Sequence, residues 1–171
     1  MNITFIGGGN MASAMIGGLL KNGWAPQSIT VVEIEAPTRA QLQSRLKVNT
    51  APGIDAKNAD ATCLVLAVKP QHMRAVAREL APFLRKQLVI SIAAGIRLGD
   101  LGRWLSGYPR IVRAMPNTPA LVLAGVTGLC KTKAVSAEDQ GVAERILGAV
   151  GATLWFDRRS EEHTSELQSQ F

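Results

Sequence analysis

Three residues near the start of the chain have the spacing of a turn that binds phosphate groups. Gly7, Gly9 and Ala12 fit the pattern G-x-G-x-x-[GA]. The first glycine permits a tight turn, the second lets a pyrophosphate approach the backbone, and the small third residue lets a helix pack against a strand. The first turn of that helix offers free N–H groups and a partial positive charge to phosphates. We therefore predict a dinucleotide site, contacted by Ile6, Gly7, Gly8, Gly9, Asn10 and Met11.

A second group of residues that could face a ligand lies in a stiff loop over residues 113–119. Pro116 and Pro119 fix their own φ angles and push the residues before them toward extended geometry. Such a loop can hold Asn117 and Thr118 against a substrate with little loss of entropy on binding. Seen alone, the same residues also fit a proline-rich turn that follows a strand.

Strand and helix patterns alternate along the chain around these two motifs. We expect strands over residues 2–6, 28–34, 61–68, 88–92, 110–115, 121–130 and 152–156. We expect helices from the glycine turn to about residue 21, over 37–46, 71–84 and 98–105, and from Ser136 to about residue 150. This alternation predicts an α/β fold of the doubly wound (Rossmann) type, with a mostly parallel sheet and helices on both faces.

Length and composition describe one domain without a membrane span. The chain has 171 residues, of which 47% are hydrophobic, and no apolar run long enough to cross a bilayer. Its first residues do not show a charged segment followed by an apolar one, so we expect no secretion signal, and we interpret its two cysteines, Cys63 and Cys130, as core residues. We therefore expect a soluble, cytoplasmic protein and assign no metal ligands.

The positive charge indicates anionic small ligands rather than nucleic acid. The net charge is +6, but the Lys and Arg residues are scattered singly, without basic runs or interleaved aromatic residues. A phosphorylated cofactor and a carboxylate substrate would both be attracted by such a field.

The last residues differ in character from the rest of the chain. From residue 158 to 171 only Leu167 and Phe171 are apolar, and neither a helical nor a strand period is present. We interpret residues 1–157 as the dinucleotide-binding domain and 158–171 as an unstructured, foreign or read-through tail. His163 in this tail is accordingly not assigned a catalytic role.

Four segments in order resemble the cofactor domain of pyrroline-5-carboxylate reductase, the last enzyme of proline biosynthesis. They are residues 5–12 (FIGGGNMA), 66–71 (LAVKPQ), 91–96 (SIAAGI) and 113–119 (RAMPNTP). The resemblance extends from residue 1 to about residue 157. It implies NADPH- or NADH-dependent reduction of 1-pyrroline-5-carboxylate, a cyclic imine, to L-proline.

The resemblance also implies roles for residues that follow two of the predicted strands. Ala67, Val68, Lys69 and Pro70 would contact the cofactor, with Lys69 near phosphate or ribose unless it is a solvated loop lysine. Ile92, Ala93 and Ala94 would leave room for the nicotinamide, although plain strand-end packing also explains their small size. Asn117 would line the nicotinamide and substrate edge, whereas Gln71 and His72 fit a helix start better than catalysis.

Glu33 leaves the choice of cofactor open. It lies at the end of the second predicted strand, where a carboxylate normally accepts hydrogen bonds from a free ribose 2′-hydroxyl and so favours NADH. Arg39 could instead turn toward a 2′-phosphate, and Glu33 could point to solvent. Because the family more often uses NADP, we expect NADP, with NAD as the alternative.

The family's helical C-terminal domain has no counterpart in this sequence. That domain forms the dimer and holds the substrate, so we expect a homo-oligomeric parent enzyme and an inactive chain without catalytic residues of its own. A non-catalytic dinucleotide-binding chain and a related reductase with another substrate remain alternatives; the proline loop argues against the second. We also expect part of the apolar segment 121–156 to be exposed and to cause self-association.

Overall fold

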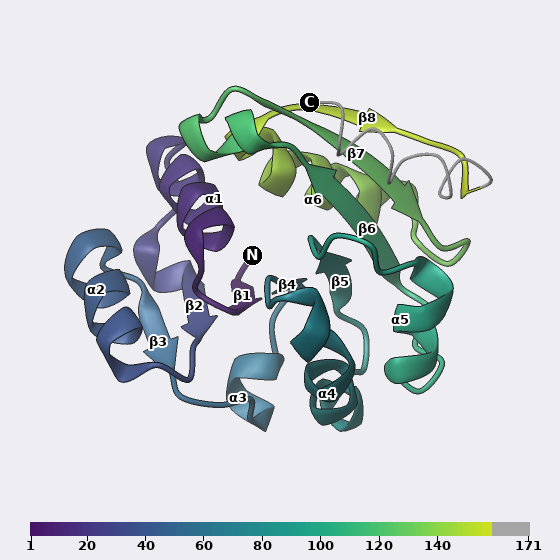
Figure 1. Cartoon of the computed structure of the whole chain (residues 1–171), viewed down its shortest axis with the longest axis horizontal. Helices are drawn as coiled ribbons and strands as arrows, with labels where there is room; N and C mark the ends of the chain where they lie inside the picture. The colour runs from purple at the N-terminus through teal and green to yellow at the C-terminus, as the bar shows by residue number, and fades with distance from the viewer. Residues whose placement is uncertain (159–171) are drawn as a thin grey trace.

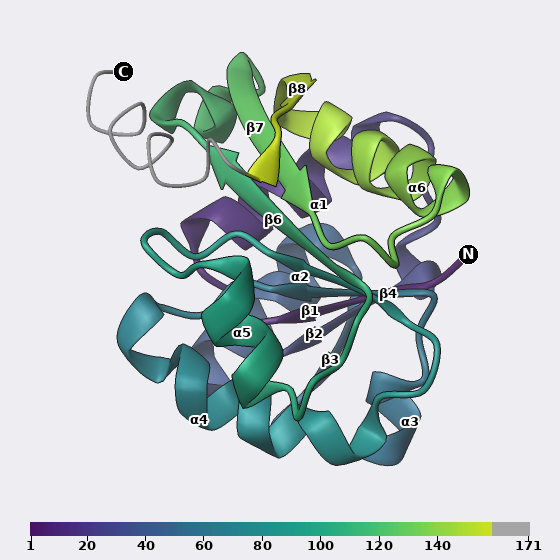
Figure 2. The same cartoon turned by 90° about the vertical axis from the view of Figure 1, so that its right-hand side faces the viewer.

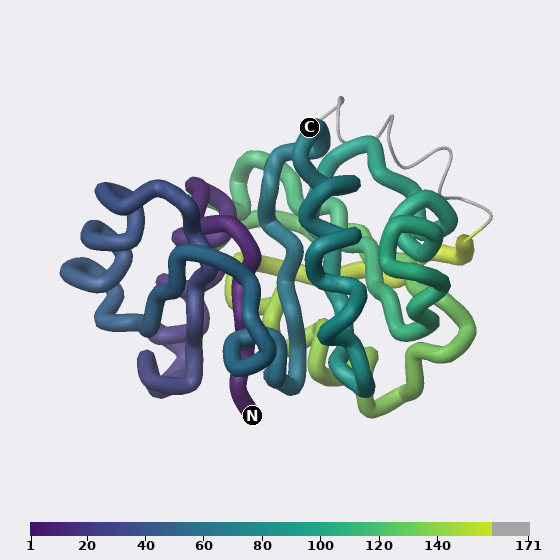
Figure 3. Tube along the Cα trace, turned by 90° about the horizontal axis from the view of Figure 1, so that it is seen from below, coloured from purple at the N-terminus to yellow at the C-terminus, as the bar shows by residue number. Residues whose placement is uncertain are grey.

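One eight-stranded sheet runs through the computed structural model of the protein, which describes residues 1–158 (Figure 1). The strands are β1 (Ile3–Ile6), β2 (Ile29–Val32), β3 (Asn49–Ala51), β4 (Cys63–Leu66), β5 (Leu88–Ser91), β6 (Ile111–Pro116), β7 (Gly125–Lys131) and β8 (Gly151–Trp155). Their order is β3-β2-β1-β4-β5-β6-β7-β8, and each neighbouring pair is parallel except β6 with β7. Figure 3 shows β1, in purple, between the blue segments of β2 and β3 and the teal segments that follow. The predicted doubly wound, mostly parallel sheet is confirmed.

Helices cover both faces of this sheet. They are α1 (Asn10–Lys21), α2 (Ala36–Leu46), α3 (Ala56–Ala59), α4 (Pro70–Leu80), α5 (Leu98–Trp104) and α6 (Ala137–Leu147). Short 3-10 helices are η1 (Pro26–Ser28), η2 (Ala81–Phe83), η3 (Thr118–Val122) and η4 (Gly148–Val150). Figure 2 shows α1 and α6 on one side of the sheet and α4 and α5 on the other. Within the described residues, none of the helices has the length and apolar character needed to cross a bilayer.

Residues on the two faces of the central strands contribute to two separate hydrophobic clusters. Successive strand residues point to opposite faces, so Phe5 belongs to one cluster with Met15 of α1 and Ile146 of α6, whereas Ile6 belongs to the other with Met73 of α4. Every residue of β1 and of β4 is buried. Burial on both faces explains why β4 is a continuous apolar run and why β1 is apolar except for Thr4, whose hydroxyl donates to the carbonyl oxygen of Asn58.

Most predicted elements are present with shifted ends. Of the strand predicted over 61–68, only Cys63–Leu66 form β4, and residues 67–69 lead directly into α4. The helix predicted over 71–84 ends at Leu80 and continues as η2, because Pro82 has no N–H to extend the α-helical ladder. The helix that Ser136 caps ends at Leu147 and is followed by η4.

The strand predicted over residues 121–130 is wrong for residues 121–124. Because β7 runs antiparallel to β6, the chain must reverse direction between Pro116 and Gly125. That reversal is made by η3 and by Leu123, which adopts a left-handed conformation with φ 62°. A run of apolar residues therefore forms a turn here, and the strand begins only at Gly125.

Apart from the 3-10 helices, one strand and one α-helix were not predicted from the sequence. Strand β3 has three residues, starts with the exposed Asn49 and has no apolar run. Helix α3 has four residues, but its capping box is readable in the sequence: the Asp55 side chain accepts from the Asn58 backbone, and the Asn58 side chain accepts from the Asp55 backbone. The β3 signal is weak because that strand is held mainly by its pairing with β2.

Candidate cofactor site

The strand register brings the predicted cofactor residues to one edge of the sheet. Ile6 is the register partner of both Val32 and Leu66, and Leu66 is the partner of Ser91. The segments that follow these four residues therefore leave the sheet side by side; they are Gly7–Gly9, Glu33, Ala67–Pro70 and Ile92–Ala94. From β1 the sheet extends through β2 and β3 on one side and through β4 and β5 on the other, so the strand order reverses beside β1. Ligands of open α/β sheets bind in the crevice at such a point.

The backbone requires glycine at the first position of the turn. Gly7 has φ +104°, and a Cβ atom there would lie 2.6 Å from the carbonyl oxygen of Ala67. The Gly7 N–H donates to the carbonyl oxygen of Val32 at 2.8 Å. Close packing of β1, β2 and the β4–α4 loop thus fixes the course of the turn.

Gly9, in contrast, faces open space. A Cβ atom at Gly9 would have no other atom within 4 Å, and Gly9 precedes α1 without any side chain capping that helix. No side chain at the N-cap position bonds to the N–H groups of the first helical turn, and Gly9 and Asn10 are both exposed. This geometry fits a pyrophosphate, which the predicted roles of Gly7 and Gly9 require.

A cavity of about 500 Å³ extends from the glycine turn along the sheet edge. It is lined by Gly7–Gly9, by Glu33 and Ile34 after β2, and by Val68 and Lys69 after β4. Gly53 and Ile54, after β3, and one face of α4 complete the wall. The size is that of a small-molecule site.

Glu33 is anchored at the glycine turn. Its Oε2 accepts from the Gly8 N–H at 2.9 Å, and its Oε1 accepts from the Glu35 N–H at 3.0 Å. The residue is half-buried. The alternative that Glu33 points to solvent is therefore wrong.

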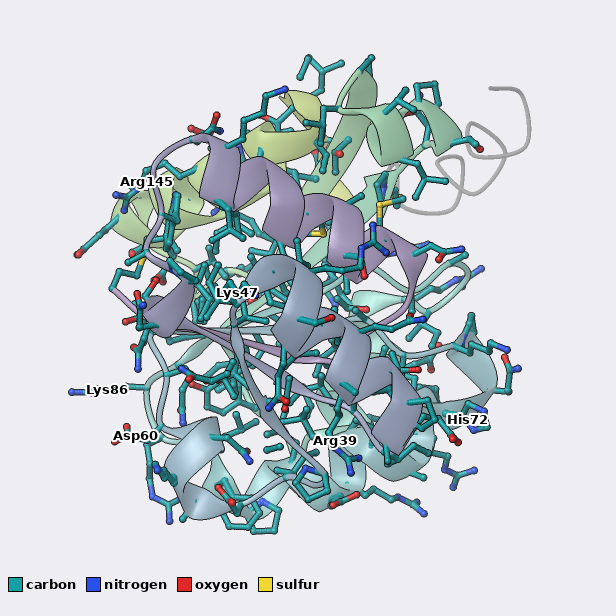
Figure 4. All side chains as sticks on the ribbon, turned by 90° about the vertical axis from the view of Figure 1, so that its left-hand side faces the viewer. Arg39, Lys47, Asp60, His72, Lys86 and Arg145 are labelled. Atoms are coloured by element: carbon teal, nitrogen blue, oxygen red, sulfur yellow. The ribbon has the colours of Figure 1, made fainter. Side chains whose placement is uncertain are left out.

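Arg39 lies against the same turn. Its Nη1 donates to the carbonyl oxygens of Glu33, at 2.7 Å, and of Ile34, at 2.8 Å. Figure 4 shows the labelled cations Arg39, Lys47, Lys86 and Arg145 on separate parts of the molecule. Their positions agree with the scattered basic residues of the sequence.

The start of α4 contributes two polar residues to the cavity. Lys69 precedes the helix and is exposed, and His72 lies in the first turn. Gln71 and His72 are helix-start residues, as predicted. Pro70 is the first helical residue and is exposed. Among residues 1–158, no three His, Cys, Asp or Glu side chains are grouped as metal ligands.

Other predicted residues lie at the same edge but outside this cavity. Ala93 is buried, Ile92 is half-buried and Ala94 is exposed. Asn10 lines a second cavity of about 600 Å³ between α1 and α2, whereas Met11 is half-buried and packs against the core.

The proline loop is held to β7 by Asn117. Its Oδ1 accepts from the Val126 N–H at 2.9 Å, and its carbonyl oxygen accepts from the Ala120 N–H at 3.0 Å. These bonds stiffen the loop beyond what the prolines impose. Thr118 is exposed, and the substrate-facing role of both residues stays a prediction.

Sequence reasoning missed several residues of the cavity. Ile34, Ile54, Val76 and Glu79 line it but were not predicted as site residues. The apolar spacing of Met73, Val76, Ala77 and Leu80 could have placed Val76 on the inner face of α4. Cys63 and Cys130, in contrast, are buried core residues as expected, and burial raises the pKa of the Cys63 thiol.

Known proteins share both this fold and these motifs. Residues 2–95 match the model of the family described as NADP oxidoreductase, coenzyme F420-dependent. The pyrroline-5-carboxylate reductase of Pseudomonas aeruginosa is 44% identical over 161 residues, which are 93% of this chain and 59% of that protein. The enzyme of the same name from Pasteurella multocida is 42% identical over 168 residues, 95% of this chain and 61% of that protein.

Solved structures agree with the sequence relatives. A pyrroline-5-carboxylate reductase from Coxiella burnetii has a TM-score of 0.86 and 42% identity, covering 91% of this chain and 58% of its own. A Plasmodium falciparum pyrroline carboxylate reductase with NADP bound has a TM-score of 0.85 over 99% of this chain and 62% of its own, but at 23% identity it shows the fold alone. The chain thus spans about 60% of the length of these relatives. It belongs to the family described as NADP oxidoreductase, coenzyme F420-dependent, and within that fold it resembles the pyrroline-5-carboxylate reductases.

Proposed function

We propose that the protein to which this chain belongs reduces 1-pyrroline-5-carboxylate to L-proline, and that residues 1–157 form its dinucleotide-binding domain. The curated relatives of this name support the reaction. The family description and the NADP bound to the Plasmodium protein support NADP as cofactor, with NAD as the alternative.

The observation that carries this proposal is the register of β2, β1, β4 and β5. It places the glycine turn beside the segments that begin at Glu33, Ala67 and Ile92. The open space at Gly9 and the uncapped start of α1 would receive the pyrophosphate, and the cavity beside Glu33 would receive the adenosine. When bound, the cofactor supplies the hydride.

The chain's own contribution is to bind and orient. Ile92, Ala93 and Ala94 would leave room for the nicotinamide, while Asn117 and Thr118 would face the substrate. A loop fixed by the bond from the Val126 N–H to Asn117 loses little entropy when a substrate docks on it. We assign no catalytic side chain within this chain. A cytoplasmic homo-oligomer that binds a small molecule, and neither nucleic acid nor membrane, completes the proposal.

A second candidate is a chain that binds the dinucleotide without catalysis. It is favoured by the described residues, which form a site that fits a dinucleotide but to which we assign no catalytic side chain. A related reductase with another substrate is supported only by fold likeness, such as that to the prephenate dehydrogenase of A. aeolicus at 17% identity.

Calorimetric titration and an activity assay separate these candidates. We expect the 171-residue chain to bind NADP⁺ or NAD⁺ but to show no reduction of 1-pyrroline-5-carboxylate. Activity near that of a full-length relative would contradict the expectation that this chain forms only the cofactor-binding part. If neither dinucleotide bound, the proposed function itself would be wrong.

A further inference from the structure

We propose that Glu33 makes the adenosine end of the site select an unphosphorylated ribose, so that this chain binds NAD(H) more tightly than NADP(H). The inference rests on the proposed function only in requiring that the chain binds a nicotinamide dinucleotide. It concerns one residue of this chain, and it selects NAD, the alternative cofactor of the proposed function, over the NADP expected for the family.

The position of Glu33 relative to the glycine turn is the first step. Oε2 of Glu33 accepts from the N–H of Gly8, between the two glycines assigned to the turn and the pyrophosphate. Each carboxylate oxygen has a second lone pair, so both can still accept a hydrogen bond from a ribose hydroxyl. A carboxylate at the end of the second strand of this fold forms such bonds with the ribose 2′-hydroxyl.

The hydrogen bonds of Glu33 also prevent it from moving aside. A 2′-phosphate carries about two negative charges at pH 7, and its approach to a carboxylate is repulsive. Rotation of the Glu33 side chain away from the ligand would break its bonds to the N–H groups of Gly8 and Glu35. Two further carboxylates, of Glu35 and Glu79, line the same cavity. Both are exposed, so solvent and salt screen their charges more strongly than that of the half-buried Glu33.

Arg39, the cation that the sequence suggests for a 2′-phosphate, is hydrogen-bonded to the backbone of the turn after β2. The Nη1 of Arg39 donates to two backbone carbonyl oxygens of the turn after β2, and Arg39 is not among the residues that line the cavity. These two hydrogen bonds hold the guanidinium of Arg39 beside the turn, so bringing Nη1 to a phosphate inside the cavity would break both of them. Lys69 does line the cavity, but it follows β4 rather than β2.

Ile34 supplies an apolar surface next to Glu33. Its side chain is 78% exposed at the rim of the cavity. It has no donor for a phosphate, but it can pack against the flat face of an adenine. A carboxylate followed by an exposed apolar residue thus suits adenosine and not its 2′-phosphate.

Titration of NAD⁺ and of NADP⁺ into the 171-residue chain tests this inference. We expect the dissociation constant for NAD⁺ to be lower than that for NADP⁺ by at least about tenfold, because facing like charges cost more than a tenfold change in affinity. Glu33→Ser is expected to tighten NADP⁺ binding and weaken NAD⁺ binding. The ratio of the NADP⁺ dissociation constant to the NAD⁺ dissociation constant should then fall to about one or below. Glu33→Gln removes the charge but keeps an acceptor for Gly8, and it is expected to narrow the ratio without loss of fold.

Glu79→Gln is the matched control, since it removes an exposed carboxylate from the same cavity without touching the glycine turn. We expect it to change the ratio much less than Glu33→Gln. Circular dichroism of each variant verifies the fold. Tighter binding of NADP⁺ by the unaltered chain, or an unchanged ratio in both Glu33 variants, would overturn the inference and leave the proposed function intact. Absence of binding of either dinucleotide would overturn both.

Discussion

Arg110 and Asp139 join the start of β6 to the first turn of α6. Nη2 of Arg110 donates to Oδ1 of Asp139 at 2.5 Å, and Nε donates to Oδ2 at 3.3 Å. Oδ2 also accepts from the Ser136 N–H at 3.1 Å and so closes the capping box of α6. The Asp139 side chain is only 8% exposed. One carboxylate therefore accepts hydrogen bonds both from the start of α6 and from an arginine that directly precedes β6.

Asp139→Asn is expected to lower the free energy of unfolding by about 2 kcal/mol, because it weakens two charge-assisted hydrogen bonds and the cap of α6. Urea denaturation at neutral pH measures the loss. Glu138→Gln, which changes an exposed carboxylate in the same helical turn, should cost far less. Equal losses in the two variants would refute a special role for the Arg110 pair.

The same carboxylate predicts a loss of stability in acid. Burial alone would raise the pKa of Asp139, but the hydrogen bonds from Arg110 and Ser136 outweigh it and hold the pKa below its ordinary value. A carboxyl whose pKa is lowered by folding stabilises the folded state. This contribution is fully present above the pKa of the unfolded chain, about 3.9, and is lost as the pH falls through the lower pKa of the folded state. The free energies of unfolding of the unaltered chain and of Asp139→Asn should therefore differ most near neutral pH and converge below about pH 4. A difference that persists in acid would assign the effect to packing.

Gly9→Val should abolish dinucleotide binding while leaving the fold intact. The extended backbone of Gly9, φ −73° and ψ −170°, suits valine, and the added atoms enter open space where we place the pyrophosphate. Gly17→Val, on the same helix and also in open space, is the control and should bind normally. Calorimetric titration and thermal melting check both variants. Undiminished binding in Gly9→Val would disprove the assignment of the glycine turn.

An exposed apolar face on β7, β8 and η3 predicts self-association of the 171-residue chain. Of the apolar residues in the segment 121–156, Leu129 and Ile146 are buried, whereas Val122 and Leu154 are 75% and 54% exposed. Leu121 and Val126 are exposed as well. Exposed apolar patches in a soluble domain commonly mark interaction surfaces. Light scattering over a wide range of concentrations should show weak oligomers that dissociate on dilution.

Leu154→Lys should reduce this association, because it places a charge in the apolar face. Ala40→Lys adds the same charge at an exposed position on α2 and should leave the association unchanged. A monomer at every concentration would show that the face does not self-associate.

Local patterns were sufficient to predict the framework of this protein. The glycine turn, the apolar runs of β1 and β4 and the capping residue Ser136 each report on their own neighbourhood in the sequence. The presence and type of most strands and helices follow from such local signals, because burial of one face imposes a period on the sequence, whereas several ends were shifted. For the same reason the order of strands and helices agreed with the doubly wound sheet.

Only the tertiary structure decided the features that depend on partners distant in sequence. The carboxylate of Glu33 is directed by an N–H of Gly8, 25 residues away, and no local pattern could distinguish this position from one in solvent. Leu121 and Val122 belong to a turn because β7 must run back along β6, although their apolar character alone favours a strand. Side-chain direction and chain reversal are set by long-range hydrogen bonds and packing, which a sequence period of two or 3.6 residues does not encode.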